Sequence, residues 1–204
     1  MKHFNFVFLL IFLLLSCEKQ TNKELIKSQD STTIKTEEKK EIKLIDTLTN
    51  EEKQLRLNKL RKNYDEFKGI TWFYDKTTTK YNNRNSFHAY IATGKDFATS
   101  LRLRIQYFGD DWLFIESYII KTDFSTFTLT PDKVESDHSS EVWEWCDVSV
   151  DSEIYKILKD ITNSKVVKVR MIGKYYKDRE IPTSEKKALL NVIKGFEALG
   201  GVIK

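Results

Sequence analysis

The sequence predicts an α+β fold for residues 49–204, with a mainly antiparallel sheet on which an N-terminal helix and two C-terminal helices pack. Through the middle of this region apolar side chains recur at every second position, which is typical of strands that bury one face. At both of its ends they recur at helical spacing. Strands in series followed by segregated helices favour an antiparallel sheet covered on one face.

The first predicted helix begins at Thr49. The stretch Thr49-Asn50-Glu51-Glu52 matches a capping box, in which a Thr hydroxyl and a Glu three residues later satisfy each other's free backbone donors. We expect the helix to continue to Gly69, because glycine easily adopts the left-handed conformation that ends a helix. Its apolar stripe would consist of Leu57, Leu60, Tyr64 and Phe67.

Six segments rich in aromatic and β-branched residues are then predicted as strands. They cover residues 70–74, 87–92, 101–107, 112–122, 126–129 and 142–148. The clearest is 101–107, whose strict alternation places one face in the core and one in water. Since Gly109-Asp110-Asp111 indicates a turn, we expect this strand to pair with the next one as an antiparallel hairpin.

The last third of the chain returns to helical periodicity. A helix is predicted over 152–162, a strand over 166–172, and a second helix over 184–199 that ends at Gly200-Gly201. The apolar stripes are Ile154, Ile157, Leu158 and Ile161 on the first helix, and Leu189, Val192, Ile193 and Phe196 on the second.

The N-terminus has the layout of an export signal. Lys2 precedes an apolar run over residues 4–15, which at about 12 residues is shorter than the roughly 20 needed to span a bilayer. The following Leu14-Leu15-Ser16-Cys17 resembles the lipobox of bacterial lipoproteins. This resemblance implies removal of residues 1–16, lipid on the sulfur of Cys17, and acylation, for instance with palmitate, of the new amino terminus. The alternative is an ordinary secretory peptide whose cleavage site contains Cys.

Residues 18–48 contain no aromatic residue and are rich in Lys, Glu, Thr, Ser and Asp. Such a segment cannot bury enough apolar surface to offset its ordering entropy. We therefore expect residues 17–48 to be a lipidated, flexible tether. It would hold a single globular domain, residues 49–204, outside the cytoplasm at a membrane of the bacterial cell envelope.

Parts of this domain resemble uncharacterised extracytoplasmic domains of bacterial lipoproteins. The likeness rests on Asp110-Asp111-Trp112-Leu113-Phe114-Ile115-Glu116-Ser117, on Val142-Trp143-Glu144-Trp145, and on the closing region 163–201. It covers most of residues 64–201. The resemblance implies a lipoprotein domain and no particular activity.

Composition limits the classes of function. Removal of residues 1–16 would take away Lys2 and no acidic side chain, so the formal charge would fall from +4 to +3. This near balance disfavours nucleic acid as a partner, because no concentrated basic face is evident. With Cys17 committed to lipid, only Cys146 remains and no intramolecular disulfide is expected. Glycine-rich phosphate and dinucleotide loops and Gly-x-Ser-x-Gly are absent from the sequence, so no cofactor is expected.

Two groups of residues could in principle form a catalytic site or a metal site. Cys146 could be a nucleophile if His88 or His138 activated it, but its place on a strand beside two tryptophans favours a small buried residue. The segment from Asp132 to Glu141 gathers possible metal ligands, of which Asp137, His138 and Glu141 are the best placed. It lacks the spacing of a calcium loop or a zinc helix, so an acidic surface loop is the favoured interpretation.

Trp143 and Trp145 are the third candidate, as ligand-binding residues. Two positions apart on one strand, they would share a face and could stack a sugar or a peptide. A core face has the same spacing, and large apolar side chains favour the core. We therefore expect both indoles to be buried and Glu144, between them, to face solvent.

These observations favour a non-enzymatic envelope lipoprotein. A long tether, one compact domain and no catalytic constellation suit binding or scaffolding of another envelope component, either a protein or a glycan. Three alternatives remain open. They are an exported hydrolase, a carbohydrate- or peptide-binding module, and a lipoprotein that neutralises a toxin or excludes a phage.

Overall fold

The computed structural model describes residues 48–203 of the chain. The predicted signal peptide, Cys17 and nearly all of the predicted tether lie outside these residues. In chain order the elements are α2 (Asn50–Leu57), β1 (Leu60–Asp65), β2 (Ile70–Asp75), β3 (Ser86–Gly94), β4 (Ser100–Gly109), β5 (Ser117–Lys121), β6 (Thr126–Leu129), β7 (Glu135–His138), β8 (Val142–Ser149), α3 (Ser152–Asn163), β9 (Lys168–Ile172), β10 (Tyr176–Glu180) and α4 (Thr183–Ala198).

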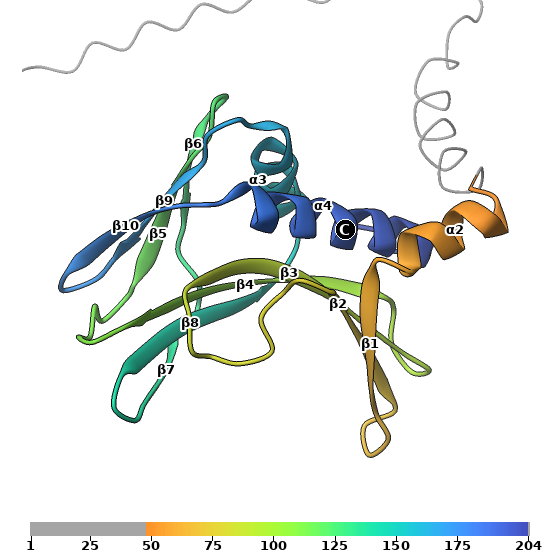
Figure 1. Ribbon diagram of the computed structural model, residues 1–204, viewed down its shortest axis with the longest axis horizontal. Helices are drawn as coiled ribbons and strands as arrows, with labels where there is room; N and C mark the ends of the chain where they lie inside the picture. Colours follow the sequence, from red (N-terminus) through yellow and green to blue (C-terminus); the bar gives the residue numbers. More distant parts are fainter. Residues whose placement is uncertain (1–47, 204) are drawn as a thin grey trace, which may run out of the picture.

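The predicted α+β class is confirmed, but two antiparallel sheets are present where the sequence predicts one. The larger sheet has the order β1-β2-β3-β4-β8-β7, and the smaller one has the order β10-β9-β5-β6. Figure 1 shows α4 lying along one face of the larger sheet, with the smaller sheet beside it. Within residues 48–203 no helix combines the length and the apolar character needed to span a bilayer.

The helix predicted from Thr49 to Gly69 is wrong in its second half. The capping box is confirmed, since Thr49 Oγ1 accepts from Glu52 N and Glu52 accepts from Thr49 N. The helix α2 nevertheless ends at Leu57, and Leu60 begins β1. Leu60 and Tyr64 are four residues apart, a spacing that places two side chains on one face of a helix or of a strand. Pairing with β2 decides between them.

The inner face of the larger sheet and one side of α4 form the main core. Phe87, Ile91, Leu103 and Ile105 are nearly inaccessible, as the alternation of β3 and β4 predicts. They meet the predicted stripe of α4, which is confirmed as buried. Gly195 permits this close approach, because a Cβ atom there would lie 2.5 Å from Cδ1 of Leu60.

The predicted hairpin after residues 101–107 is also wrong. β4 pairs with β3 and β8, whereas residues 112–116 leave the first sheet and lead into β5 of the second. Their backbone is held by Glu144 of β8, whose carboxylate accepts hydrogen bonds from the N–H groups of residues 113, 114 and 115 at 2.6, 3.1 and 2.7 Å. Phe114 between them has a φ of 55°. These amides cannot join a strand ladder while they bind the carboxylate.

The helix α3 confirms the predicted helix over 152–162 and its buried stripe. Asp151 caps it by accepting from Ile154 N at 2.8 Å. Two strands, β9 and β10, separate α3 from α4, so only α4 is a C-terminal helix. The α4 helix is the one that covers the larger sheet.

Candidate functional site

The face of the larger sheet that points away from α4 carries aromatic and charged side chains. We call it the open face. Neighbouring residues of a strand point to opposite sides, so paired residues on adjacent strands form rows across this face. One row contains Arg61, Tyr74, Tyr90 and Arg102, and the next contains His88, Arg104 and Asp147.

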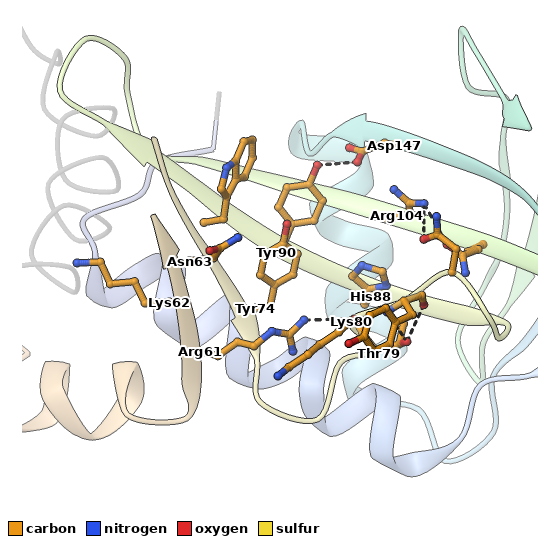
Figure 2. Close-up of a pocket in the computed structure, with 14 residues that line it drawn as sticks. Arg61, Lys62, Asn63, Tyr74, Thr79, Lys80, His88, Tyr90, Arg104 and Asp147 are labelled. Carbon is orange, nitrogen blue, oxygen red and sulfur yellow. Dashed lines mark hydrogen bonds between the residues drawn. The ribbon is translucent and has the colours of Figure 1, made fainter. Parts of the chain in front are cut away.

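A pocket of about 650 Å³ lies on the open face (Figure 2). Pockets of ~300–1,000 Å³ are typical of small-molecule sites. Residues of five strands and of the β2–β3 loop, residues 76–85, surround it. They are Arg61, Lys62, Asn63, Trp72, Tyr74, Thr79, Lys80, Tyr81, Asn82, His88, Tyr90, Arg104, Gln106 and Asp147. We call this the sheet-face pocket.

Three aromatic side chains pack together in the pocket. Tyr74 and Tyr90 stack with their ring centroids 5.2 Å apart, and Trp72 is tilted against Tyr90 at 5.7 Å. Burial raises the pKa of both tyrosine hydroxyls, and that of Tyr90 rises further because it donates to Asp147 Oδ2 at 2.6 Å. Tyr90 therefore remains a protonated donor at neutral pH.

Asp147, the carboxylate that lines the pocket, is already neutralised. Arg102 donates from Nε to Asp147 Oδ1 at 2.7 Å and from Nη2 to the Asp147 carbonyl at 3.0 Å. Its Nε also lies 3.0 Å from the Tyr90 hydroxyl. By contrast, no carboxylate of residues 48–203 forms an ion pair with Arg61, Lys62, Lys80 or Arg104. The pocket consequently has a net positive charge.

Arg61 fastens the β2–β3 loop to the sheet. Its Nη1 donates to the carbonyls of Asp75 at 2.8 Å and Thr78 at 2.7 Å, and its Nη2 donates to that of Thr79 at 3.2 Å. The guanidinium carbon lies 4.9 Å from the centroid of the Tyr74 ring. A guanidinium has five N–H donors, so Arg61 keeps two beyond these three bonds.

Arg104 approaches the same pocket from β4. Its Nη2 donates to Asn82 Oδ1 at 3.2 Å and Gln106 Oε1 at 3.0 Å, while its guanidinium carbon lies 4.7 Å from the Trp145 ring centroid. Burial lowers the pKa of both Arg61 and Arg104. Each guanidinium is thus partly removed from water and retains unused donors, an arrangement that an anion would satisfy.

His88 lies between the two arginines and is only 8% exposed. Its Nδ1 is 3.1 Å from Ser86 Oγ. Burial, and then the positive charges of Arg104 and Arg61, lower the pKa of His88 to about 3. A general base works best with a pKa near the operating pH. The Ser86–His88 pair is therefore poorly suited to hydrolysis at neutral pH.

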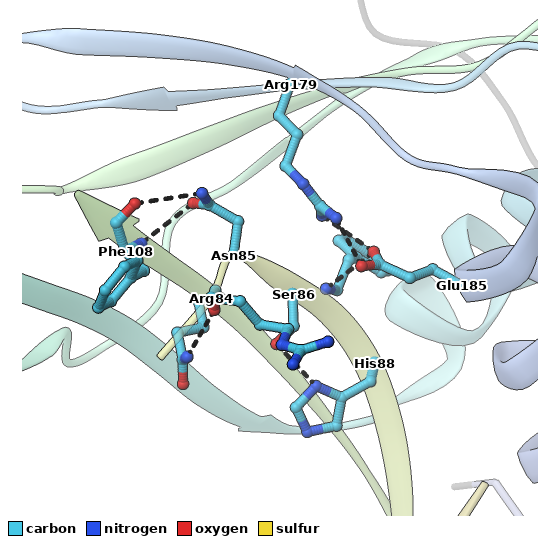
Figure 3. Close-up of polar contacts among 9 residues, drawn as sticks. Arg84, Asn85, Ser86, His88, Phe108, Arg179 and Glu185 are labelled. Atoms are coloured by element: carbon cyan, nitrogen blue, oxygen red, sulfur yellow. Dashed lines mark hydrogen bonds and ion pairs between the residues drawn. The ribbon is translucent and has the colours of Figure 1, made fainter. Parts of the chain in front are cut away.

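A smaller cavity of about 140 Å³ lies between the start of α4 and residues 77–88, and it shares Thr79 and His88 with the sheet-face pocket. Figure 3 shows how polar contacts hold this region. Glu185 accepts from both terminal nitrogens of Arg179, at 2.9 and 2.5 Å, and from Phe87 N at 3.1 Å. Asn85 bonds the backbone of Phe108 through its amide nitrogen and oxygen. These contacts fix the end of the β2–β3 loop.

The predicted burial of Trp143 and Trp145 is wrong. Both indoles are half-buried on the open face, and Glu144 is the inward residue, with an exposure of 2%. The inward position suits a carboxylate here because three backbone donors converge on it. Trp145 lies beneath Arg104 beside the pocket. Alternation alone could not tell which set of side chains faces inward.

The other candidates do not come together as a site. Cys146 is a buried free cysteine, as predicted, and burial raises the pKa of its thiol. It faces the core, whereas His88 is on the open face. Asp137 and His138 lie exposed on β7, followed by Glu141 before β8, and Asp137 bonds the His138 backbone. Within residues 48–203 no three acidic, His or Cys side chains are grouped as metal ligands.

The comparisons with known proteins add no assignment. No protein-family model matches the chain, and no curated protein or solved structure is significantly similar to it.

Proposed function

We propose that this protein is a bacterial envelope lipoprotein, anchored through Cys17, whose domain binds an organic anion in the sheet-face pocket. The binding proposal depends on one observation. Three basic side chains without a carboxylate partner among residues 48–203, those of Arg61, Lys80 and Arg104, line a pocket with an aromatic floor. The envelope proposal depends on the lipobox and the export signal.

An anion fits the electrostatics of the pocket. Two of its cations, Arg61 and Arg104, are partly desolvated, and a charge removed from water is costly unless another charge compensates it. Both guanidiniums are held rigid by hydrogen bonds and by a ring beneath them. Little side-chain entropy would then be lost on binding. Binding without turnover suits the low basicity of His88.

Arg104→Gln should weaken anion binding by about 10- to 150-fold, the equivalent of one charge-assisted hydrogen bond. Calorimetric titration would measure this with three anions: trigalacturonate, hexaglutamate and pyrophosphate. Maltotriose and hexaglutamine serve as neutral probes. Arg170→Gln is the matched control, because Arg170 also stacks on a tyrosine ring but is neutralised by Asp178. It should leave the affinity unchanged.

At least one anion should bind more tightly than its neutral counterpart, and more weakly at higher salt. If none of the three anions binds, or if neutral and anionic probes bind equally, the pocket is not an anion site. Thermal melting of each variant would check that the fold is retained.

The lipid anchor has its own test. Cys17→Ser should abolish incorporation of labelled palmitate and move the protein out of the membrane fraction, because the acyl chains supply the membrane affinity. Cys146→Ser is the control and should change neither result, since Cys146 is buried in the domain. Unchanged labelling of the Cys17→Ser protein would rule out the anchor.

A further inference from the structure

The chemistry of the pocket lining narrows the class of anion. Every lining side chain is aromatic or polar, and none is aliphatic. Three carboxamides line it: Asn63, Asn82 and Gln106. A sugar ring has a C–H face and a rim of hydroxyls that both donate and accept. Aromatic faces suit the C–H face, and carboxamides, which also donate and accept, suit the hydroxyls.

Only some aromatic faces are available to a ligand. Tyr74 is covered by Tyr90 and Arg61, and Trp145 is covered by Arg104. Trp72 is only tilted against Tyr90, at 59°, and Tyr81 of the β2–β3 loop is 72% exposed. A run of nucleobases would need successive uncovered faces. Two separated faces match a ligand with two rings instead.

The side-chain rings of Trp72 and Tyr81 lie at opposite ends of the pocket. Trp72 pairs with Ala92 on β3, four residues and therefore about 13 Å along the strand from His88. The His88 row continues to Arg104 on β4, two strands and about 10 Å across from β2. Tyr81 adjoins Asn82, which accepts a hydrogen bond from Arg104. One sugar ring cannot reach both faces.

Both guanidiniums lie toward the Tyr81 end, where Arg61 bonds the carbonyl of Thr79 and Arg104 bonds Asn82. Arg61 on β1 and Arg104 on β4 flank the pocket, and each keeps unused N–H donors. Building on the proposed anion binding, we infer that the ligand is an acidic oligosaccharide of at least two rings. Its rings stack on Trp72 and Tyr81, and its carboxylates bind the two guanidiniums.

The inference is tested by ligand length. Calorimetric titration of the mature protein should give trigalacturonate at least about 10-fold tighter binding than monomeric galacturonate, because only the trimer contacts both rings. Uncharged maltotriose should bind more weakly than trigalacturonate by a similar factor.

Two variants locate the rings. Tyr81→Ala, on an exposed loop, and Trp72→Ala should each bring the affinity for the trimer to within about 3-fold of the affinity for the monomer, because only one ring is then left for stacking. Trp72→Phe should keep most of the advantage of the trimer. Phe124→Ala, which removes an exposed ring in the turn between β5 and β6 of the smaller sheet, is the control.

The outcomes separate this inference from the binding proposal. Equal affinity for monomer and trimer, or an advantage of the trimer that survives Tyr81→Ala, would overturn the oligosaccharide and leave an anion site. Tighter binding of hexaglutamate or of an oligothymidylate than of trigalacturonate would replace the sugar by a peptide or a nucleic acid. Failure of every anion to bind would overturn both proposals.

Discussion

Glu144→Ala should lower the free energy of unfolding by about 3–5 kcal/mol. The carboxylate is 2% exposed and accepts three backbone N–H bonds, from residues 113, 114 and 115. Its removal leaves buried donors without a partner, which costs about 1–3 kcal/mol for each group. It also releases the segment that holds Phe114 at a φ of 55°. A domain is stable by only about 5–15 kcal/mol, so this loss is severe.

Urea denaturation followed by circular dichroism would measure this effect as a fall in the midpoint. Glu116→Ala is the matched control, because Glu116 is an exposed glutamate in the same connecting segment. It should change stability by less than about 0.5 kcal/mol. A loss below about 1 kcal/mol for Glu144→Ala would contradict the structural role assigned to this carboxylate.

The sequence could not predict this role for Glu144. The sequence pattern shows that side chains alternate along β8, but it does not show which of them face the core. Hydrophobicity favours burial of the indoles. The deciding contacts come from the backbone of residues 113–115, about 30 positions away. Buried carboxylates depend on such distant donors, so local alternation is least informative where a polar residue is inside.

Helices and strands whose apolar residues recur at regular spacing were predicted correctly. The stripes of α3 and α4 and the alternation of β4 are set by neighbouring residues, and the structure confirms them. The water-facing side of β4 already contained Arg102 and Arg104, which was one signal for the site. What the sequence did not indicate was that β1 and the β2–β3 loop surround that side.

Because β1 was assigned to a helix, the side of the pocket that it forms could not be predicted. On a helix, Arg61 and Asn63 would be solvent-exposed residues that do not contribute to one site. As residues of a strand paired with β2, they join Tyr74 and Trp72 on the open face. Whether a segment is a helix or a strand therefore determines which of its side chains share a face and can form a site. Here the pairing of β1 with β2 selects the strand, and local propensity does not reveal such a contact between strands.

His88 should make the stability of the domain depend on pH below about 6.5. In the folded protein the pKa of His88 is lowered to about 3 from 6.5, first by burial and then by Arg104 and Arg61. Above pH 6.5 both the folded and the unfolded chain hold this imidazole neutral. As the pH falls toward 3, only the unfolded chain takes up the proton, so the folded state loses about 1.4 kcal/mol of stability for each pH unit.

The free energy of unfolding should fall between pH 7 and pH 5, and in the His88→Gln protein this fall should be smaller by about 2 kcal/mol. The measurement compares the slope of the free energy of unfolding against pH between the variant and its parent, because carboxylates contribute equally to both slopes. His138→Gln, which removes an exposed imidazole on β7, is the matched control. Identical slopes for the His88→Gln protein and its parent would mean that His88 takes up its proton in the folded state. Burial and the two guanidiniums would then not lower the pKa of His88 as its place in the pocket requires.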